Sequence, residues 1–467
     1  MKNSYSSLYN GLFKYLELDN ILIKDSKKSY SKEDLFEFIK IIDANFYKIF
    51  GKKKSKKIQT ICILAKPNFN SVVFIIYCFI KGIKLIILNN RLQEDELNEQ
   101  IKKAKVEIVV SNFNSNLSNI NISNFFKKIK IKNHLKICKN INKEALVLFT
   151  SGSTANAKGV VLTKKNILAN VVFYKQQLNP RYGESYMLSL PFFHIGGLMI
   201  IFRCLFLGLT IVLPKEVKLK YIKESLKRNN IDYISLVQTQ LLEMHKDCKK
   251  ELRKAKRIIL GGSSFNEKII NQAIKHKFLI SVSYGMTELT STLCLSEKLK
   301  KYKINYAGIV SKNSKITLNK KNEIIVKGDN VFKRYLGYRR KIGGFATGDL
   351  GKIVDKKLYV LGRKDRMFIS GGENIYPEEI EKTIMKFSKI KEVVVLSREH
   401  PKWGQRPIAY CVFNKSPKKN PKEKLIIFLR KKLAKYKIPD DIIILNNLPK
   451  LANGKIDYRM LKNTCIS

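Results

Sequence analysis

The chain has 467 residues, of which 45% are hydrophobic, so it is large and apolar enough to bury two or three cores. Lys and Arg number 90 against 38 Asp and Glu, which gives a net charge of +52 and a general attraction for anions. The lysine runs at 52–57, 127–136 and 298–303 lie in separate segments with no evident common face, and no nucleic-acid-reading motif accompanies them. We therefore explain the charge by codon drift in an AT-rich genome, in preference to a polyanion partner such as nucleic acid or an anionic membrane.

Three further features bear on the compartment. The eight cysteines stand singly, without a CxxC pair, which favours reduced thiols over disulfides or zinc ligands. Residues 1–11 lack the apolar core of a signal peptide. Residues 196–213 are apolar, but Arg203 near their middle and Gly208 before a β-branched run predict a helix, a turn and a buried strand. We expect a cytoplasmic protein without a transmembrane segment.

From about residue 28 to residue 340, short apolar runs alternate with amphipathic stretches, which favours α/β layers around largely parallel sheets. Helices are expected at 95–104 and at 265–276, the second capped by Ser264. Residues 312–327 alternate in polarity around a turn, as in a small antiparallel sheet or barrel. Strands are expected at 58–65, 84–89, 186–191, 209–214, 233–237 and 257–262.

A second, smaller unit follows a strand at 357–363. Its expected elements are a helix, two strands and a helix, at 377–387, 393–399, 408–413 and 422–436. With about 100 residues it is long enough to form its own domain. We expect a large N-terminal domain at 1–363, made of layered α/β subdomains plus a small β-barrel-like part, and a small α+β domain at 364–467.

The loop TSGSTANAKG at 150–159 is the most informative segment. Two strand-like runs, 144–150 and 159–163, enclose it. Small residues between two strands can place N–H and hydroxyl groups around polyphosphate oxygens, and a lysine adds a point charge. The loop differs from the Walker pattern, in which GK[ST] opens a helix. Its candidate phosphate ligands are Thr150, Ser151, Gly152, Ser153, Thr154 and Lys158.

Four later segments match, in the same order, the sequence motifs of one protein family. They read SYGMTELTS at 283–291, FATGDLG at 345–351, GRKDRMFISGGENIYPEEIE at 362–381 and LANGKIDYR at 451–459. With the loop at 150–159, they make the chain resemble the adenylate-forming superfamily of acyl-CoA synthetases, luciferases and peptide-synthetase adenylation domains. The resemblance runs nearly from end to end.

The resemblance implies a reaction in two halves. A substrate carboxylate attacks the α-phosphorus of ATP to give an acyl-adenylate and pyrophosphate, and a thiol, usually that of CoA, then displaces AMP. Loop 150–159 would hold the β- and γ-phosphates, Thr287 would contact the α-phosphate, and Glu288 would bind Mg²⁺. Nucleotide contacts are also implied for Ser283, Tyr284 and Gly285 near the adenine and for Asp349 and Arg363 at the ribose.

The small domain would carry the catalytic lysine. Lys455 matches it and would bridge the attacking carboxylate and the ribose-side oxygens. The family's small domain swings between the two half-reactions, and Asp365 matches the pivot. Gly371 and Gly372 match the stretch that lines the pantetheine tunnel of CoA, where a side chain would obstruct the backbone; a plain turn is the competing interpretation.

One departure from the family pattern concerns the phosphate loop. The family usually reads TSGSTGxPKG, whereas Ala155 and Ala157 stand here in place of the glycine and the proline. If position 155 needs a positive φ, alanine costs on the order of 1 kcal/mol and reshapes the loop. We expect an effect on phosphate affinity more than on the reaction itself.

The segment PFFHIGGLMIIFR at 191–203 is similar to the o-succinylbenzoate–CoA ligases of menaquinone synthesis. A fatty acid and another aromatic acid are alternative substrates. A decayed, non-catalytic protein that binds a nucleotide or a polyanion is an alternative function. His194 is either a pocket wall or a core histidine, and Arg203 either meets a second substrate carboxylate or is packed structurally. The acid pocket is expected at His194, Arg203, Gly261, Gly262, Ser263 and Thr292.

The expected partners are small molecules: a carboxylic acid, ATP with Mg²⁺, and CoA. No specific nucleic acid is expected. The sequence does not fix the oligomeric state, and a homodimer remains open.

Overall fold

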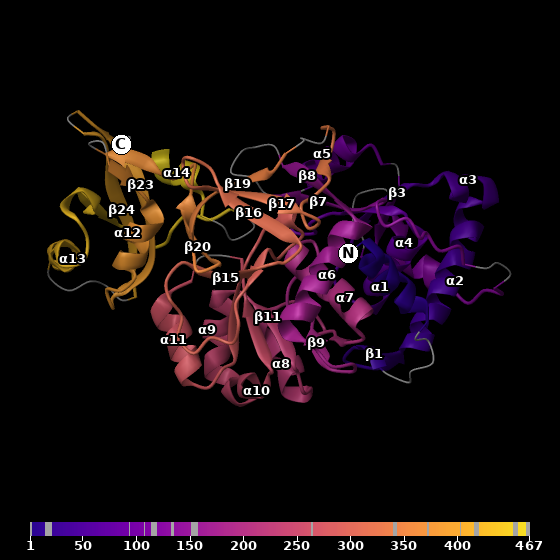
Figure 1. The fold of residues 1–467 in the computed structure, drawn as a ribbon. Helices are drawn as coiled ribbons and strands as arrows, with labels where there is room; N and C mark the ends of the chain where they lie inside the picture. Colours follow the sequence, from indigo (N-terminus) through magenta and orange to yellow (C-terminus); the bar gives the residue numbers. More distant parts are fainter. Residues whose placement is uncertain are drawn as a thin grey trace.

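The computed structural model describes residues 2–14, 21–92, 94–106, 108–113, 119–131, 135–150, 157–262, 265–339, 343–370, 373–401, 403–414, 420–451 and 456–463. Figure 1 shows a large body and, beside it, a smaller one made by the C-terminal part of the chain, coloured orange to yellow. The predicted α/β class with a large and a small domain is confirmed. The predicted boundary between residues 363 and 364 falls between two strands and stays a prediction.

The first sheet of the large body is parallel at its centre and antiparallel at one edge. Side chains along its strands alternate between two cores: Ile61 and Ile63 face one, Cys62 and Leu64 the other. Burial on both faces explains why these strands read as continuous apolar runs. In order across the sheet, the described strands are β18 (Arg334–Tyr335), β8 (Lys158–Thr163), β7 (Glu144–Thr150), β4 (Lys84–Ile87), β3 (Thr60–Leu64), β5 (Val109–Ser111) and β6 (Ile120–Asn121).

The second sheet is longer. It is parallel from β13 to β1 and antiparallel on either side, where the hairpin expected at 312–327 extends it. Its described strands, in order, are β16 (Ser314–Leu318), β17 (Glu323–Gly328), β19 (Phe345–Val354), β20 (Lys357–Arg363), β15 (Tyr306–Val310), β14 (Cys294–Leu295), β13 (Ile280–Tyr284), β12 (Arg257–Leu260), β11 (Tyr233–Leu236), β9 (Ser185–Met187), β10 (Thr210–Val212), β1 (Ile21–Lys24) and β2 (Ser29–Ser31).

Helices fill the space between the two sheets and cover their outer faces. The central layer, which shares one core with both sheets, holds α1 (Lys2–Lys14), α2 (Lys32–Phe50), α4 (Phe69–Lys81), α6 (Lys164–Leu178) and α7 (Ile195–Leu207). The outer face of the first sheet is covered by α5 (Glu94–Ala104). The outer face of the second is covered by α8 (Leu219–Arg228), α9 (Gln238–Asp247), α10 (Lys249–Lys254) and α11 (Glu267–Lys275). Shorter helices are α3 (Lys52–Lys57), η1 (Ile122–Phe126) and η2 (Thr287–Leu289).

Local chemistry fixes where the helices begin and end. Capping boxes start α2 at Ser31, α4 at Asn68 and α6 at Thr163. The cap predicted for α11 was wrong: Asn266, and not Ser264, accepts hydrogen bonds from the first-turn N–H groups. Ser264 itself lies outside the described residues. Both amino acids are good caps, so composition alone did not distinguish them.

The apolar stretch at 196–213 forms the predicted helix, turn and buried strand. Helix α7 ends at Gly208, which has a left-handed φ of 67°, and β10 follows. In the part of the chain that the structure describes, no helix combines the length and apolarity needed to cross a membrane.

The small C-terminal body has one sheet with cores on both faces. The helix predicted at 422–436 is too long: α13 ends at Arg430, because the chain must turn there to bring β25 beside β24. Its described elements are β21 (Phe368–Ser370), β22 (Glu373–Ile375), α12 (Pro377–Ile384), β23 (Ile390–His400), β24 (Gly404–Phe413), α13 (Pro421–Arg430), η3 (Lys435–Lys437), β25 (Asp441–Ile444) and α14 (Tyr458–Asn463).

Candidate active site

The predicted nucleotide motifs meet where the parallel strands of the second sheet end. The carboxyl ends of β9, β11, β12 and β13 lie along one edge, the usual ligand-binding edge of an open α/β sheet. Gly261 follows β12 there, and a Cβ on it would lie 2.7 Å from the Ser283 hydroxyl. Gly262 has a φ of 88°. A side chain at position 261 would therefore displace the Ser283 hydroxyl, and position 262 has the left-handed backbone that favours glycine.

A tight turn follows β13. The Leu293 N–H donates to the Tyr284 carbonyl at 2.8 Å, and the Ser291 N–H donates to the Met286 carbonyl at 3.1 Å. A Cβ on Gly285 would collide with the carbonyl oxygen of Ser291. Only glycine fits at position 285, and the turn presents Thr287 and Glu288 from η2 at the sheet edge.

Asp349 is the centre of the first polar cluster. It is 7% exposed, and its two oxygens accept hydrogen bonds from the Tyr284 hydroxyl at 2.7 Å and from Arg363 Nη1 at 3.2 Å. Burial raises the pKa of Asp349, and the hydrogen bonds from Tyr284 and Arg363 oppose this rise. Burial also raises the pKa of Tyr284 well above its ordinary value, with the charge of Asp349 adding to the rise, so Tyr284 stays a donor. Three predicted nucleotide residues thus lie in direct contact.

Glu288 belongs to a second cluster, which joins the two sheets. Its Oε1 accepts a hydrogen bond from the Tyr335 hydroxyl at 3.0 Å. The Lys158 ammonium lies 5.5 Å from the centre of the Tyr335 ring. Among the described residues, the second oxygen of Glu288 has no hydrogen-bond partner. Tyr335 on β18 therefore connects the lysine of the phosphate loop to the carboxylate predicted to bind Mg²⁺.

The phosphate loop is described only at its two ends. Thr150 ends β7 and pairs with Lys158, the first residue of β8, so the loop joins two strands as predicted, and the structure shows that they are antiparallel. Ser151, Gly152, Ser153, Thr154 and Ala155 lie outside the described residues, whereas Ala157 lies within them.

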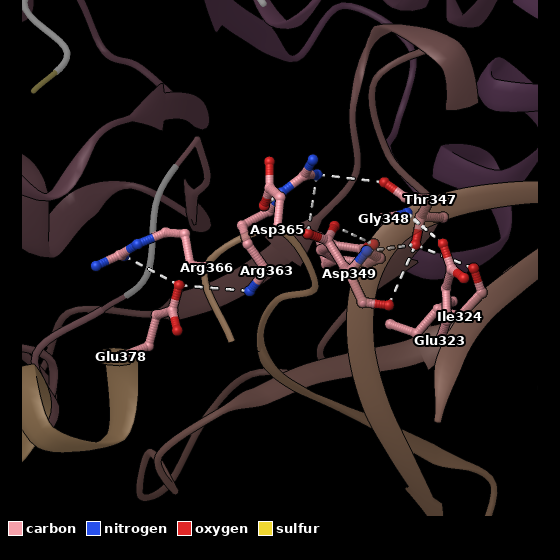
Figure 2. Close-up of polar contacts among 10 residues, drawn as sticks. Glu323, Ile324, Thr347, Gly348, Asp349, Arg363, Asp365, Arg366 and Glu378 are labelled. Atoms are coloured by element: carbon pink, nitrogen blue, oxygen red, sulfur yellow. Dashed lines mark hydrogen bonds and ion pairs between the residues drawn. The ribbon is translucent and has the colours of Figure 1, made fainter. Parts of the chain in front are cut away.

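Arg363 links this site to the small domain (Figure 2). Its Nε donates to Asp365 at 3.2 Å, and its backbone N–H donates to Glu378 on α12 at 3.4 Å. Glu378 also pairs with Arg366 at 3.0 Å. A Cβ on Gly362 would lie 2.5 Å from Glu378 Oε2, so β20 and α12 approach closely at the predicted pivot.

The predicted catalytic lysine, Lys455, lies outside the described residues, and so do Gly371 and Gly372. The residues flanking Lys455 are described: Lys450 and Ile456 form an antiparallel bridge. Tyr458 packs its ring 4.9 Å from the Arg366 guanidinium. The segment after Lys455 therefore packs at the pivot.

Arg203 is buried, with 2% exposure, and packs its guanidinium 3.4 Å from the centre of the Tyr174 ring. It donates to Asn170 at 2.9 Å and to the Ser291 hydroxyl at 3.3 Å. Thr292 joins the same network through a contact of 3.2 Å with the Tyr174 hydroxyl. Within the described part of the chain, no carboxylate lies within ion-pair distance of Arg203. The arginine is packed, and it holds the end of the 283–292 turn.

His194 precedes α7 and is exposed, with its ring 4.6 Å from that of Phe193. The alternative of a core histidine was therefore wrong, and a pocket wall stays a prediction. Gly197 follows, where a Cβ would collide with the Pro191 carbonyl. Ser263 lies outside the described residues.

Comparison with known families agrees with this geometry. The model of the AMP-binding enzyme family matches residues 51–336, and that of the AMP-binding enzyme C-terminal domain matches residues 379–455. The first match covers more than half of the chain.

The chain belongs to the AMP-binding enzymes.

Among its relatives is a 2-succinylbenzoate–CoA ligase from Listeria monocytogenes, 30% identical over 446 residues that cover 92% of this chain and 94% of the relative. The o-succinylbenzoate CoA synthetase of Bacillus subtilis has been solved in three relevant states. Its complex with ATP and magnesium ion superposes on this AMP-binding enzyme with a TM-score of 0.87, at 27% identity, covering 97% of this chain and 99% of the other.

Two further complexes of the Bacillus subtilis protein differ in their fit. The complex with the acyl-adenylate intermediate superposes with a TM-score of 0.86, at 27% identity, covering 97% of this chain and 98% of the other. The complex of a double mutant with a product analogue superposes with a TM-score of only 0.70, at 26% identity and the same coverage. Over nearly equal lengths, this AMP-binding enzyme fits the adenylate-bound state better than the product-analogue state.

Sequence reasoning missed several residues of the site. Tyr335, Tyr174 and Asn170 had no signal, because tyrosine and asparagine are abundant in this chain and their partners come from distant segments. Glu378 and Arg366 lie inside the quoted motif at 362–381, but only the fold shows that they pair.

Proposed function

We propose that the protein is an AMP-forming acid–CoA ligase that converts 2-succinylbenzoate, ATP and CoA to 2-succinylbenzoyl-CoA, AMP and diphosphate through an acyl-adenylate. One observation carries the reaction class: side chains from four separate motifs form a set of contacts that joins the first sheet to the edge of the second. It runs from Lys158 through Tyr335 to Glu288, and along the turn to Tyr284, Asp349 and Arg363. The choice of acid is supported by the relatives that carry that name. The resemblance assigns this step to menaquinone synthesis.

The cluster around Asp349 would bind the ribose of ATP. An ionised carboxylate accepts hydrogen bonds from the two ribose hydroxyls, while Tyr284 and Arg363 hold it in place. Thr287 and Lys158 would contact phosphate oxygens, since they flank Glu288 from the turn and from the phosphate loop. Fixed cations and donors then stabilise the charge that develops at the α-phosphorus.

Glu288 fits a magnesium ion. Tyr335 orients one of its oxygens, and among the described residues the other oxygen is open. One carboxylate, with phosphate oxygens and water as the remaining ligands, is the usual protein share of such a site. When bound, the ion neutralises phosphate charge.

The acid would lie between His194, Gly261–Gly262 and the turn that ends at Thr292. Arg203 behind this turn is a cation without a described carboxylate partner. Because Arg203 is buried and bonded to Asn170 and Ser291, it would act on the acid through the turn that it holds in place.

The orientation of the small domain fits the first half-reaction. Support comes from the closer superposition on the adenylate-bound relative than on the product-analogue state. Lys455 would enter the site in this orientation and bridge the attacking carboxylate and the ribose-side oxygens. A swing about Asp365 would then admit CoA past Gly371 and Gly372. A cytoplasmic location, where ATP and CoA are available, completes the proposal, and a homodimer remains open.

A panel of acids tests this function. The purified protein is incubated with ATP, Mg²⁺, CoA and either 2-succinylbenzoate, benzoate or octanoate, and pyrophosphate and thioester are measured. We expect both products with 2-succinylbenzoate at a kcat/KM at least about 100-fold above that of the other acids, because only this acid carries the second carboxylate that a pocket for 2-succinylbenzoate must bind. If octanoate is the preferred acid, the proposed substrate is wrong but the reaction class stands. If no acid leads to pyrophosphate release, the reaction class is wrong.

A further inference from the structure

The end of the large body opposite the small domain carries an unusual charge pattern. Residues 44–93 contain ten Lys or Arg and residues 108–143 contain seven, and neither segment contains a single Asp or Glu. Figure 1 shows α2 and α3 at this far end, away from the yellow C-terminal elements.

The fold brings two of the three lysine runs together, which corrects the prediction that the runs share no face. The Asn45 side chain of α2 donates to the Lys127 carbonyl at 2.8 Å. On the other side, the Lys143 ammonium donates to the Gln59 side chain at 3.1 Å. The stretch that contains α3 therefore begins beside residue 127 and ends beside residue 143. The run at 298–303 packs elsewhere, beside α11.

We call this region the basic end surface and define it by its exposed lysines. None of them makes an ion pair with a carboxylate of the described residues. Its exposed hydrophobic side chains are aliphatic: Ile49 is 37% exposed and Ile131 is 40% exposed. The lysines are Lys48, Lys52, Lys53, Lys54, Lys56, Lys57, Lys127, Lys128, Lys130, Lys136 and Lys139.

We propose that the basic end surface docks the protein onto an anionic lipid bilayer. Clustered lysines near an anionic membrane each contribute about 1 kcal/mol of attraction, and interspersed aliphatic side chains add apolar contact with the interface. No acidic side chain of residues 44–93 or 108–143 weakens the attraction between these lysines and anionic lipids, because neither segment contains Asp or Glu. The proposal is independent of the substrate, since the surface is at the opposite end of the molecule from the small domain.

A lipid surface fits better than a nucleic acid. Proteins that hold single-stranded nucleic acid without sequence preference use exposed aromatic rings on which bases stack. The strongly exposed aromatic side chains of the described chain, such as Tyr338 and Trp403, lie outside this surface. Ile49 and Ile131 suit acyl-chain contact and offer no ring for stacking.

Vesicle sedimentation tests the proposal with a matched pair of variants. The surface variant carries Lys53→Gln, Lys54→Gln, Lys56→Gln and Lys57→Gln. The control carries Lys298→Gln, Lys300→Gln, Lys301→Gln and Lys303→Gln, four exposed lysines whose loss changes the net charge equally. Both are measured with the wild type at 150 mM salt on phosphatidylcholine vesicles with and without 30% phosphatidylglycerol.

We expect the wild type to bind only the anionic vesicles. The surface variant should bind about 30-fold more weakly, equivalent to two of its four lysines at about 1 kcal/mol each, and the control less than about threefold more weakly. Ile49→Ser with Ile131→Ser should weaken binding severalfold without changing its salt dependence. Unchanged thermal unfolding midpoints confirm folding.

Three results would overturn the proposal. The first is equal weakening in both lysine variants, which would mean attraction by net charge alone. The second is no vesicle binding at 150 mM salt. The third is tight binding of single-stranded poly(U) that anionic vesicles do not displace, which would assign the surface to a nucleic acid.

Discussion

At the scale of single residues, Asp349 has a charge that ligand binding needs and that lowers the stability of the folded protein. Its carboxylate is buried, and burial raises its pKa, so the ionised form that ribose hydroxyls need costs free energy in the folded protein. Tyr284 and Arg363 offset part of this cost. A buried carboxylate kept at such a position is typical of a ligand-binding residue.

Asp349→Asn tests this balance. We expect the KM for ATP to rise at least about tenfold, because a charge-assisted acceptor is lost. The thermal unfolding midpoint should stay equal or rise, since a buried charge is removed and Arg363 remains partly exposed. Steady-state kinetics and calorimetry measure the two effects. A lower midpoint with an unchanged KM would make Asp349 a structural residue only.

Tyr335→Phe tests the second cluster. Without its hydroxyl, Glu288 loses the donor that orients it, so kcat should fall about three- to tenfold and the Mg²⁺ concentration for half-maximal rate should rise. Tyr338→Phe, at an exposed tyrosine three residues later, is the matched control. An unchanged Mg²⁺ dependence in Tyr335→Phe would remove Tyr335 from the metal site.

At the scale of elements, Lys164 at the start of α6 ties three segments together. Its ammonium is fully buried and donates to the Tyr9 hydroxyl of α1 at 2.8 Å and to the Cys138 carbonyl at 2.6 Å. No described carboxylate pairs with it. Burial lowers the pKa of Lys164 from 10.5 to about 8.

The lowered pKa predicts a pH dependence of stability. Between about pH 8 and pH 10.5, Lys164 is protonated in the unfolded chain and neutral in the folded one, so the free energy of unfolding rises with pH. The rise amounts to about 3 kcal/mol across the window. Lys164→Met should lack this increment, measured as the difference between variant and wild type in urea unfolding at pH 7.5 and 9.5. Parallel pH profiles would contradict this, because they would mean that the buried Lys164 keeps its proton in the folded protein at both pH values.

Periodicity and turn residues predicted most elements of the fold. The strands at 58–65 and 84–89 and the helix at 95–104 are present with ends shifted by one or two residues. Alternation also predicted the hairpin at 312–327. The end of α13 was missed, since position 430 carries no breaker and the turn is imposed by the pairing of β25 with β24.

At the scale of the whole molecule, the sequence did not predict which residues from distant segments lie next to each other. The resemblance assigned Asp349 and Arg363 to the same ribose, and the structure places the two residues opposite each other on adjacent strands. The resemblance did not predict Tyr335 beside Glu288, nor the meeting of two lysine runs on one face. The first contact depends on how the two sheets pack and the second on how α2 packs against Lys127, and no local pattern encodes either.

The close approach of Gly362 to Glu378 predicts coupling between the domains. Gly362→Ala places a Cβ 2.5 Å from the Glu378 carboxylate and disfavours the present orientation. We expect adenylation to slow about tenfold, with thioester formation from preformed acyl-adenylate changed less than about twofold. Gly362→Ala combined with Glu378→Ala removes the collision and should restore adenylation. Equal slowing of both half-reactions, without rescue, would contradict an orientation effect.

The central claim is that an acyl-adenylate forms before CoA takes part, with Lys455 supplying the charge that stabilises the transition state. Exchange of pyrophosphate into ATP, measured without CoA, tests it most directly. The account predicts exchange that requires 2-succinylbenzoate, falls at least about 100-fold in Lys455→Ala and is kept in the neighbouring control Lys450→Ala. Exchange at full rate in Lys455→Ala, or exchange that needs CoA, would contradict it.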